Sequence, residues 1–297
     1  MFPKLILVSA AFVACNAMHS FGPLSSKHGS FNVYYLYTRS SLNPEVFNSS
    51  LASIQETSMI VSRNTTIIVH GHGGTGFNTL NPTVKDALLR VEDADVIIVD
   101  WSQYSLQSYS NAVNAVPSVG TYLGLLINQL VEAGVATLDT IHIVGFGLGA
   151  HVAGYAGRGV NGHVARITGL DPSGNQWGTN SNRLRSSDAK YVEVIHTDGF
   201  GLGANGIGTN LGHTDIYANG GEGQPGCLFS SACSHQRAWE LFAASLTNNH
   251  LNAHFCNSFT EMRFNRCRGF LIPIGTNAMV KFGSGVFRIN TGRRYPY

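Results

Sequence analysis

The chain has 297 residues, of which 43% are hydrophobic, and its formal net charge is +2. This length and apolar content suffice for one substantial hydrophobic core. The small net charge excludes the extended basic surface that nucleic-acid binding requires, so we expect no nucleic-acid partner.

The first 17 residues have the features of a secretory signal peptide. One lysine precedes an apolar run, which ends in small residues at Ala17. Such a segment is removed during export, and the apolar run is too short to span a bilayer comfortably. We therefore predict a secreted, extracellular protein with no transmembrane segment, whose mature chain covers residues 18–297. On this route, the sequons at Asn48 and Asn64 are predicted glycosylation sites.

Predicted strands and helices alternate along the mature chain. Runs rich in β-branched and aromatic residues predict strands over 31–38, 65–72, 94–101, 140–145, 163–171 and 189–198. An apolar stripe, Val119, Leu123, Leu126 and Leu130, predicts a helix over about 115–134 that packs on a core. Further helices are expected after the last glycine of the 145–149 turn and over roughly 234–247. This alternation is typical of an α/β fold with a mostly parallel sheet covered on both faces.

Residues 199–226 are rich in glycine and show no periodic hydrophobic pattern. A long loop of this kind either forms a wall or lid over a functional site or is a flexible surface excursion. The sequence does not decide between these two interpretations.

The stretch IHIVGFGLGAHVAG (141–154) joins a predicted strand to a predicted helix. One interpretation is the nucleophile elbow G-x-S-x-G, with Gly147 in place of the serine. The other is the dinucleotide fingerprint G-x-G-x-x-A from Gly145 to Ala150, with Asp171 as the acid that contacts the ribose about twenty residues on. Three predicted strands precede the turn, whereas the fingerprint normally opens its domain, so we favour the elbow.

Two residues with suitable chemistry follow the turn. Asp171 ends a later strand and His235 comes after it, which is the order of acid and histidine in α/β-hydrolases. In such a triad the acid fixes the imidazole tautomer, and the imidazole activates the nucleophile. We expect both near Gly147, which is then a degenerate nucleophile position. We expect no other serine to replace it, because Ser102 follows a different strand.

The cysteines indicate disulfides. Cys15 lies in the signal peptide, so four of the five cysteines remain in the mature chain. An even number in a secreted chain indicates two disulfides, for which three connectivities are open. The simplest pairs Cys227 with Cys233 and Cys256 with Cys267. The set lacks the C-x-x-C spacing of zinc sites, so we expect no metal there.

Longer motifs extend over almost the whole mature chain. They are VYYLYTR (33–39), VHGHGG (69–74), VDWS (99–102), the glycine turn, ITGLDPSG (167–174), SDAKYVEVIHTD (187–198), GHTDIYANGG (212–221) and QPGC…CSHQRAW (224–239). Together they resemble the pancreatic-lipase-like secreted lipases and phospholipases. The resemblance implies an α/β-hydrolase fold with Asp171 and His235 as triad acid and base. It also implies that the backbone N–H groups of His72 and Leu148 are oxyanion donors.

The chain departs from the family pattern at its predicted site. Gly147 replaces the nucleophile, and His72 stands where the family usually has an apolar aromatic residue. The loop between Cys227 and Cys233 holds five residues, so the lid is reduced to a stub. In this family, short lids go with phospholipase-like or open sites.

Two further departures concern calcium and length. The calcium loop of some members retains Asp188 here, but Asn180 and Arg185 stand where acids would lie. We therefore expect no calcium and no other cofactor. The chain ends at Tyr297, without the C-terminal β-sandwich of larger relatives, so we expect one lipase-like domain over residues 18–297.

The missing serine decides the functional prediction. A triad without its nucleophile cannot form an acyl-enzyme. Glycine also relieves the backbone strain of the elbow, which is what stability favours once chemistry is lost. Some insect yolk proteins resemble this family and likewise lack the serine. We predict an inactive pseudolipase that binds lipid or another hydrophobic ligand, or serves as a storage or partner protein. The alternative is an active carboxylic ester hydrolase, a triacylglycerol lipase or phospholipase A1.

Overall fold

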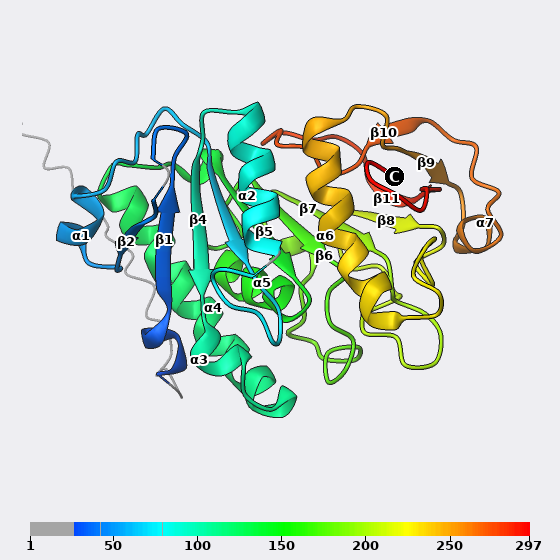
Figure 1. The fold of residues 1–297 in the computed structure, drawn as a ribbon, viewed down its shortest axis with the longest axis horizontal. Coiled ribbons are helices and arrows are strands. Elements are labelled where there is room, and N and C mark those ends of the chain that lie inside the picture. Colours follow the sequence, from blue (N-terminus) through cyan, green and yellow to red (C-terminus); the bar gives the residue numbers. More distant parts are fainter. Residues whose placement is uncertain (1–26, 42, 79) are drawn as a thin grey trace, which may run out of the picture.

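The computed structural model describes residues 27–41, 43–78 and 80–297, so the predicted signal peptide lies outside the described residues. Figure 1 shows the strands and helices along the chain. The strands are β1 (Val33–Tyr37), β2 (Glu45–Phe47), β3 (Thr65–Val69), β4 (Asp95–Asp100), β5 (Ile141–Phe146), β6 (Arg166–Leu170), β7 (Tyr191–His196), β8 (Thr214–Ala218), β9 (Asn252–Cys256), β10 (Leu271–Pro273) and β11 (Gly285–Ile289). The α-helices are α1 (Leu51–Gln55), α2 (Leu80–Val91), α3 (Ser102–Ser105), α4 (Tyr109–Glu132), α5 (Leu148–Gly159), α6 (Ser231–Thr247) and α7 (Phe259–Arg263).

The described strands form one sheet in the order β10-β9-β11-β8-β7-β6-β5-β3-β4-β1-β2. From β4 to β11 every neighbouring pair is parallel. The pairs at both edges, β1 with β4 and β2 and β9 with β11 and β10, are antiparallel. This mostly parallel sheet confirms the predicted α/β-hydrolase fold class.

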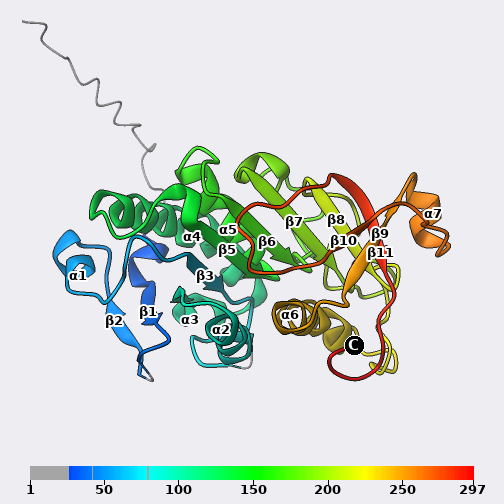
Figure 2. The same ribbon diagram turned by 90° about the horizontal axis from the view of Figure 1, so that it is seen from above.

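Helices cover both faces of the sheet. In Figure 2, α4 and α5 lie on one side, and α2 and α6 lie on the other. Neighbouring residues of the central strands face opposite layers, since Ile67 belongs to the core under α4 and α5 while Ile68 belongs to the core under α2 and α6. Both side chains are fully buried. Burial on both faces explains why these strands are continuous apolar runs.

The strand predictions hold for β1, β3, β4, β5, β6 and β7, with ends that differ by a few residues. The predicted apolar stripe of α4 is fully buried in the core. This helix begins earlier than predicted, at Tyr109, where the Ser108 side chain caps it by accepting a hydrogen bond from the Asn111 N–H. Helix starts are set by such caps as well as by apolar periodicity.

The glycine-rich segment 199–226 is more regular than expected. Residues Thr214–Ala218 form β8, which pairs with β7 and β11. All five residues are buried, so the strand lacks the polar and apolar alternation that marks a half-buried strand.

Both disulfides pair neighbouring cysteines. Cys227 is bonded to Cys233, and Cys256 to Cys267, which confirms the simplest of the three connectivities. In the part of the chain that the structure describes, no helix combines the length and the apolar character needed to cross a membrane.

The two predicted glycosylation sites differ in their surroundings. Asn48 is exposed beside β2. Asn64 is partly buried, and its Nδ2 donates to the carboxylate of Glu92. Attachment of a glycan stays a prediction at both positions, and the surroundings favour Asn48.

Candidate functional site

A sharp turn connects β5 to α5. The strand ends at Phe146 and the helix begins at Leu148, so the single residue Gly147 makes the connection. Its backbone angles are φ 57° and ψ −117°, which side-chain-bearing residues rarely adopt. This strand, tight turn and helix have the form of the elbow that presents the nucleophile in α/β-hydrolases.

A second glycine lets the elbow helix approach the sheet. A Cβ atom on Gly149 would lie only 2.2 Å from the carbonyl oxygen of Val69, the last residue of β3. Only a residue without Cβ fits this contact. The glycines of the turn therefore serve its packing, which explains a pattern that also resembles a phosphate-binding loop.

Asp171 and His235 form a hydrogen-bonded pair beside the turn. The Nδ1 atom of His235 lies 2.6 Å from Oδ2 of Asp171, which is fully buried. The other carboxylate oxygen accepts hydrogen bonds from the N–H groups of Thr197 at 2.8 Å and Asp198 at 3.0 Å. Both oxygens are thus occupied, so the dinucleotide interpretation, which needs Asp171 for a ribose hydroxyl, finds no support.

The imidazole of His235 faces the turn with its other nitrogen. A Cβ atom built on Gly147 would lie 3.1 Å from Nε2 of His235. The structure therefore brings together the three residues that the sequence proposed as a degenerate triad: Gly147, Asp171 and His235. A side chain at position 147 would be the one that meets the histidine.

The side chain of Ser173 also lies beside the position of a Cβ atom on Gly147. The sequence analysis did not predict this contact. The Oγ of Ser173 would lie 3.3 Å from a Cβ atom on Gly147, and its N–H donates to the Gly147 carbonyl at 3.2 Å. Ser173 therefore lies beside the turn, although the sequence analysis considered only Ser102, and the expectation that no other serine replaces the nucleophile stays a prediction. Because Ser173 follows Asp171 by two residues, it shares the loop that carries the acid, and this proximity in sequence could have revealed it.

A buried histidine holds the loop of Ser173 in place. Burial lowers the pKa of His151, on α5, to about 3, so its ring is neutral. Its Nδ1 accepts a hydrogen bond from the Leu184 N–H at 3.1 Å. The Nε2 atom therefore carries the proton and donates to the carbonyl oxygen of Ser173 at 2.9 Å. This bond ties the acid loop to the elbow helix.

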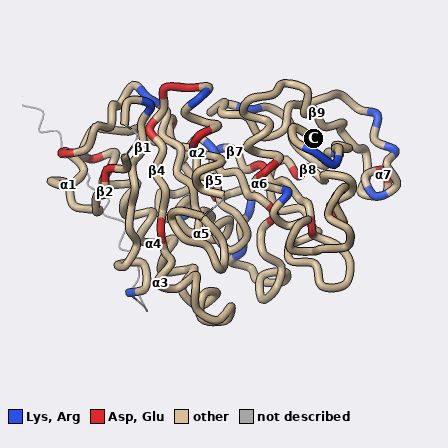
Figure 3. The backbone as a smooth tube through the Cα atoms, viewed as in Figure 1, with Lys and Arg blue, Asp and Glu red and all other residues tan. Residues whose placement is uncertain are grey.

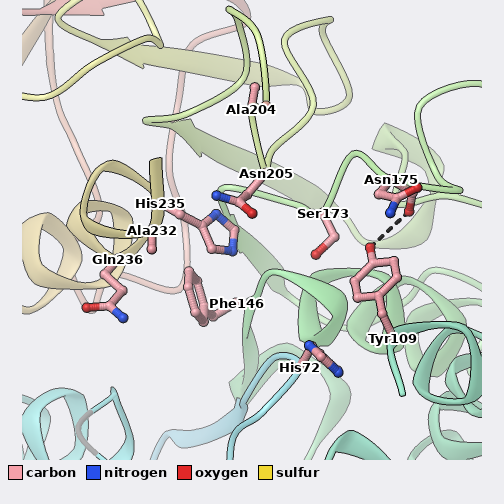
Figure 4. A pocket seen from close by; sticks show the side chains of 11 residues that line it. His72, Tyr109, Phe146, Ser173, Asn175, Ala204, Asn205, Ala232, His235 and Gln236 are labelled. Atoms are coloured by element: carbon pink, nitrogen blue, oxygen red, sulfur yellow. Dashed lines mark hydrogen bonds between the residues drawn. The ribbon is translucent and has the colours of Figure 1, made fainter. Parts of the chain in front are cut away.

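A cavity of about 550 Å³ opens in front of His235 (Figure 4). Its lining consists of His72, Tyr109, Phe146, Ser173, Asn175, Gly203, Ala204, Asn205, Ala232, His235 and Gln236. Residues 203–205 come from the glycine-rich segment, which supports its interpretation as a wall of the site. The lining includes no Asp, Glu, Lys or Arg. Lys and Arg gather instead around α7, at one end of the molecule (Figure 3).

The two expected oxyanion donors lie at the edges of this site. Leu148 is the first residue of α5, and the first N–H groups of a helix have no acceptor within it. His72 lines the cavity, and its Nε2 lies 2.9 Å from the carbonyl oxygen of Gln107. Its polar ring is thus held away from His235, against Tyr109 at 5.2 Å between ring centroids. Their role as donors stays a prediction.

In the segment expected to form the calcium loop, the acidic residue Asp188 is paired with arginine side chains. The buried carboxylate of Asp188 pairs with Arg158 Nη1 at 2.7 Å and with Arg185 Nε at 3.3 Å. Asn180 turns its side-chain oxygen to the Asn182 N–H at 2.9 Å. Two guanidinium groups at the carboxylate would repel a cation, so these residues do not fit a calcium site. Among the described residues, no group of three or more His, Cys, Asp or Glu is arranged to hold a metal.

Comparison with known proteins identifies the family. The protein-family model described as Lipase matches residues 11–271 of this chain. The chain belongs to the Lipase family. Lipase member H-B of Xenopus laevis is 40% identical over 219 residues, which cover 70% of this chain and 47% of the relative. Lipase member H of Oryctolagus cuniculus is 36% identical over 255 residues, which cover 81% of this chain and 54% of the relative.

A third relative in this comparison is a phospholipase. Phospholipase A1 member A of Bos taurus is 37% identical over 227 residues, which cover 73% of this chain and 49% of the relative. The chain spans about half the length of the curated relatives it matches. Among solved structures, Est1E from Butyrivibrio proteoclasticus is 9% identical over 70% of this chain and 80% of its own, with a TM-score of 0.34. The fold assignment therefore depends on the sheet and on the family match.

Proposed function

We propose that this protein is a secreted, catalytically inactive member of the Lipase family that binds lipid or another hydrophobic ligand beside His235. One observation carries the proposal. The elbow, the acid and the base are in place, but Gly147 supplies no oxygen atom where a side chain would meet Nε2 of His235. The chemical consequence is that no acyl-enzyme can form at this position.

The expected loss of rate is large. In a serine protease with the same triad, removal of the nucleophile lowers kcat by about 10⁶-fold. Oxyanion donors and substrate binding alone retain about 10³- to 10⁴-fold acceleration over water. A lipase reduced to this remainder is effectively a binding protein.

Ligand binding needs a cavity with an apolar part, and the site has one. Its volume of about 550 Å³ lies within the usual range of small-molecule sites. Phe146, Tyr109, Ala204 and Ala232 contribute apolar surface to the lining. The two disulfides support export, because disulfides persist mainly in oxidising compartments. We propose that binding requires no calcium, since Asp188 is paired with arginines.

The proposal is tested by turnover. The natural chain and the variants His235→Ala and Ser173→Ala are assayed with a short-chain nitrophenyl ester and a phospholipid, and each is treated with a fluorophosphonate. We expect equal background rates, no covalent label, and acyl lipid extracted from the purified protein. Turnover that exceeds the His235→Ala rate would overturn the proposal. A label on Ser173 would identify that serine as a displaced nucleophile.

A further inference from the structure

We infer that the cavity beside Gly147 binds a neutral lipid with a free hydroxyl group, such as a long-chain primary alcohol, and that this hydroxyl enters the space that a side chain at position 147 would fill. The inference deepens the proposed function and rests on it, because a nucleophile at position 147 would itself occupy that space.

Two polar side chains converge on the space that Gly147 leaves open. The position of a Cβ atom on Gly147 lies 3.1 Å from His235 Nε2 and 3.3 Å from Ser173 Oγ. Figure 4 shows these two side chains facing each other across the cavity. Because Gly147 carries only a hydrogen atom there, a ligand oxygen can enter this space and reach both polar atoms at hydrogen-bonding distance.

The hydrogen bond from His235 to Asp171 determines what the free ring nitrogen needs. Nδ1 lies 2.6 Å from the Asp171 carboxylate, which only accepts hydrogen bonds, so Nδ1 carries a proton. Nε2 is then an acceptor in the neutral ring and a donor in the protonated ring. A hydroxyl group both donates and accepts, so it matches Nε2 in either state. An ester or ether oxygen only accepts and leaves Nε2 of the neutral ring without a partner.

The hydroxyl of Ser173 offers the second hydrogen bond. A serine hydroxyl is one donor and two acceptors, and it rotates to suit its partner. The phenol of Tyr109, which donates to the carbonyl oxygen of Asn175 at 2.9 Å, is an alternative acceptor for Ser173. Because the Ser173 proton has this other partner, we expect Ser173 to contribute less to ligand affinity than His235 does.

The lining of the cavity carries no fixed charge. It includes no Asp, Glu, Lys or Arg, and the Asp171 carboxylate is occupied behind the imidazole. An anionic head group would lose its hydration without a permanent positive charge to replace it. Phe146, Ala204 and Ala232 add apolar surface to the lining. A single hydroxyl on an aliphatic chain therefore fits this site better than a carboxylate or a phosphate.

Exposed apolar side chains adjoin the lining residues in the sequence. Leu202 precedes Gly203, while Leu228 and Phe229 lie in the short disulfide loop before α6, which carries Ala232. These three side chains are exposed. They provide apolar surface for an aliphatic chain that extends beyond the cavity.

The test compares an alcohol, an ether and an acid of equal carbon number on the complete chain. 1-Octanol, its isomer methyl heptyl ether and sodium octanoate are titrated into the protein by calorimetry at pH 8. The alcohol and the ether have the same atoms, and only the alcohol donates a hydrogen bond. We expect the alcohol to bind about tenfold more tightly than the ether, because a polar group left unpaired in the site is costly. The acid should also bind more weakly than the alcohol.

Substitutions in the site locate the hydroxyl. His235→Phe keeps a ring without the nitrogen and should reduce the preference for alcohol over ether to less than about twofold. Gly147→Ala should do the same, because its methyl group fills the space of the hydroxyl. Ser173→Ala should weaken alcohol binding about threefold, by the loss of one hydrogen bond. The matched control is Gly134→Ala, which should keep the preference, since Gly134 also has a positive φ of 72° but lies outside the cavity lining, with nothing within 4 Å of an added Cβ.

The outcomes separate the two proposals. Equal affinity for alcohol and ether, tighter binding of octanoate, or a preference that survives in folded His235→Phe or Gly147→Ala would overturn the inference and leave lipid binding intact. Failure to bind any of the three compounds would overturn the inference and count against the proposed function. Neither the alcohol nor the ether contains an ester bond, so their comparison is independent of the turnover assay that tests the proposed function.

Discussion

Two pairs of histidine and aspartate in the described part of the chain have a ring nitrogen within 2.8 Å of the carboxylate, and their comparison shows what makes one of them a site. His235 and Asp171 lie 2.6 Å apart, and His196 and Asp215 lie 2.8 Å apart. The second pair is fully buried, and the other ring nitrogen of His196 bonds to the carbonyl oxygen of Ile207 at 2.7 Å. His235 instead turns its second nitrogen to Gly147 and the cavity.

The two pairs differ in the second ring nitrogen of the histidine, which is hydrogen-bonded in His196 and faces the cavity in His235. In addition to its two hydrogen bonds, His196 stacks on Tyr217, with 4.3 Å between ring centroids. Such a ring has no position for a substrate or ligand atom. We therefore interpret the His196 pair as structural and the His235 pair as part of the candidate site.

The largest predicted loss of stability follows from a substitution that breaks the His196 pair. His196→Ala leaves the buried carboxylate of Asp215 with only the N–H groups of Leu211 and Gly212, and removal of one member of a buried pair typically costs about 3–5 kcal/mol. His235→Ala should cost only about 1 kcal/mol, because its ring is partly exposed and makes one hydrogen bond, whereas the His196 ring is fully buried and makes two. Urea denaturation of both variants measures the difference. Equal losses would contradict the distinction between the pairs.

Two other buried histidines have no carboxylate partner among the described residues. They extend the comparison to the pH dependence of stability. Burial lowers the pKa of His151 to about 3 and the pKa of His142 well below its usual value. Below pH 6.5 the unfolded chain binds protons at both residues while the folded chain does not, so acid favours unfolding. His151 alone should cost about 2 kcal/mol of stability at pH 5 relative to pH 7, and His142 adds a cost of the same sign.

Replacement of both histidines measures this effect. The double variant His142→Gln and His151→Gln should show a flatter dependence of unfolding free energy on pH between 7 and 5. The variant His163→Gln, at an exposed position, serves as the control. If the double variant retained the original slope, the assignment of acid lability to these two rings would be wrong.

A change at the turn itself tests the candidate site. Gly147→Ser places a side chain on a backbone with φ 57° and between His235 and Ser173, at a predicted cost of about 1–3 kcal/mol. Gly147→Ala is the matched control and should cost about the same, since the strain comes from Cβ. Thermal denaturation reports both values. Unchanged melting temperatures would show that the turn relaxes without cost.

The smallest predicted effect concerns α6, which carries His235 and neither residue of the His196 pair. The side chain of Ser230 caps α6 by accepting a hydrogen bond from the Cys233 N–H at 3.2 Å. Loss of such a cap in Ser230→Ala should lower stability by about 1 kcal/mol. It should leave the unfolding cost of His196→Ala unchanged. In the described part of the chain, the hydrogen bonds of the His196 and Asp215 side chains join them to each other and to residues 207, 211 and 212, and none goes to this helix. A double-mutant cycle that showed strong coupling would contradict this independence.

The sequence predicted the parts of the site that depend on local motifs. The glycine turn, Asp171 and His235 each stand in a recognisable context, and their order gave their association. The pairing of His196 with Asp215 was not predicted, although both lie in quoted motifs, because it depends on the register between β7 and β8. In the same way, the wall formed by residues 203–205 depends on contacts that are distant in sequence.

The hydrolysis of a short-chain nitrophenyl ester tests the central claim most directly. The claim is that the site retains its acid and base and lacks its nucleophile. The account predicts that the natural chain and His235→Ala have the same background rate and that neither carries a fluorophosphonate label. A rate for the natural chain well above that of His235→Ala would show that the site still catalyses hydrolysis and would contradict the account.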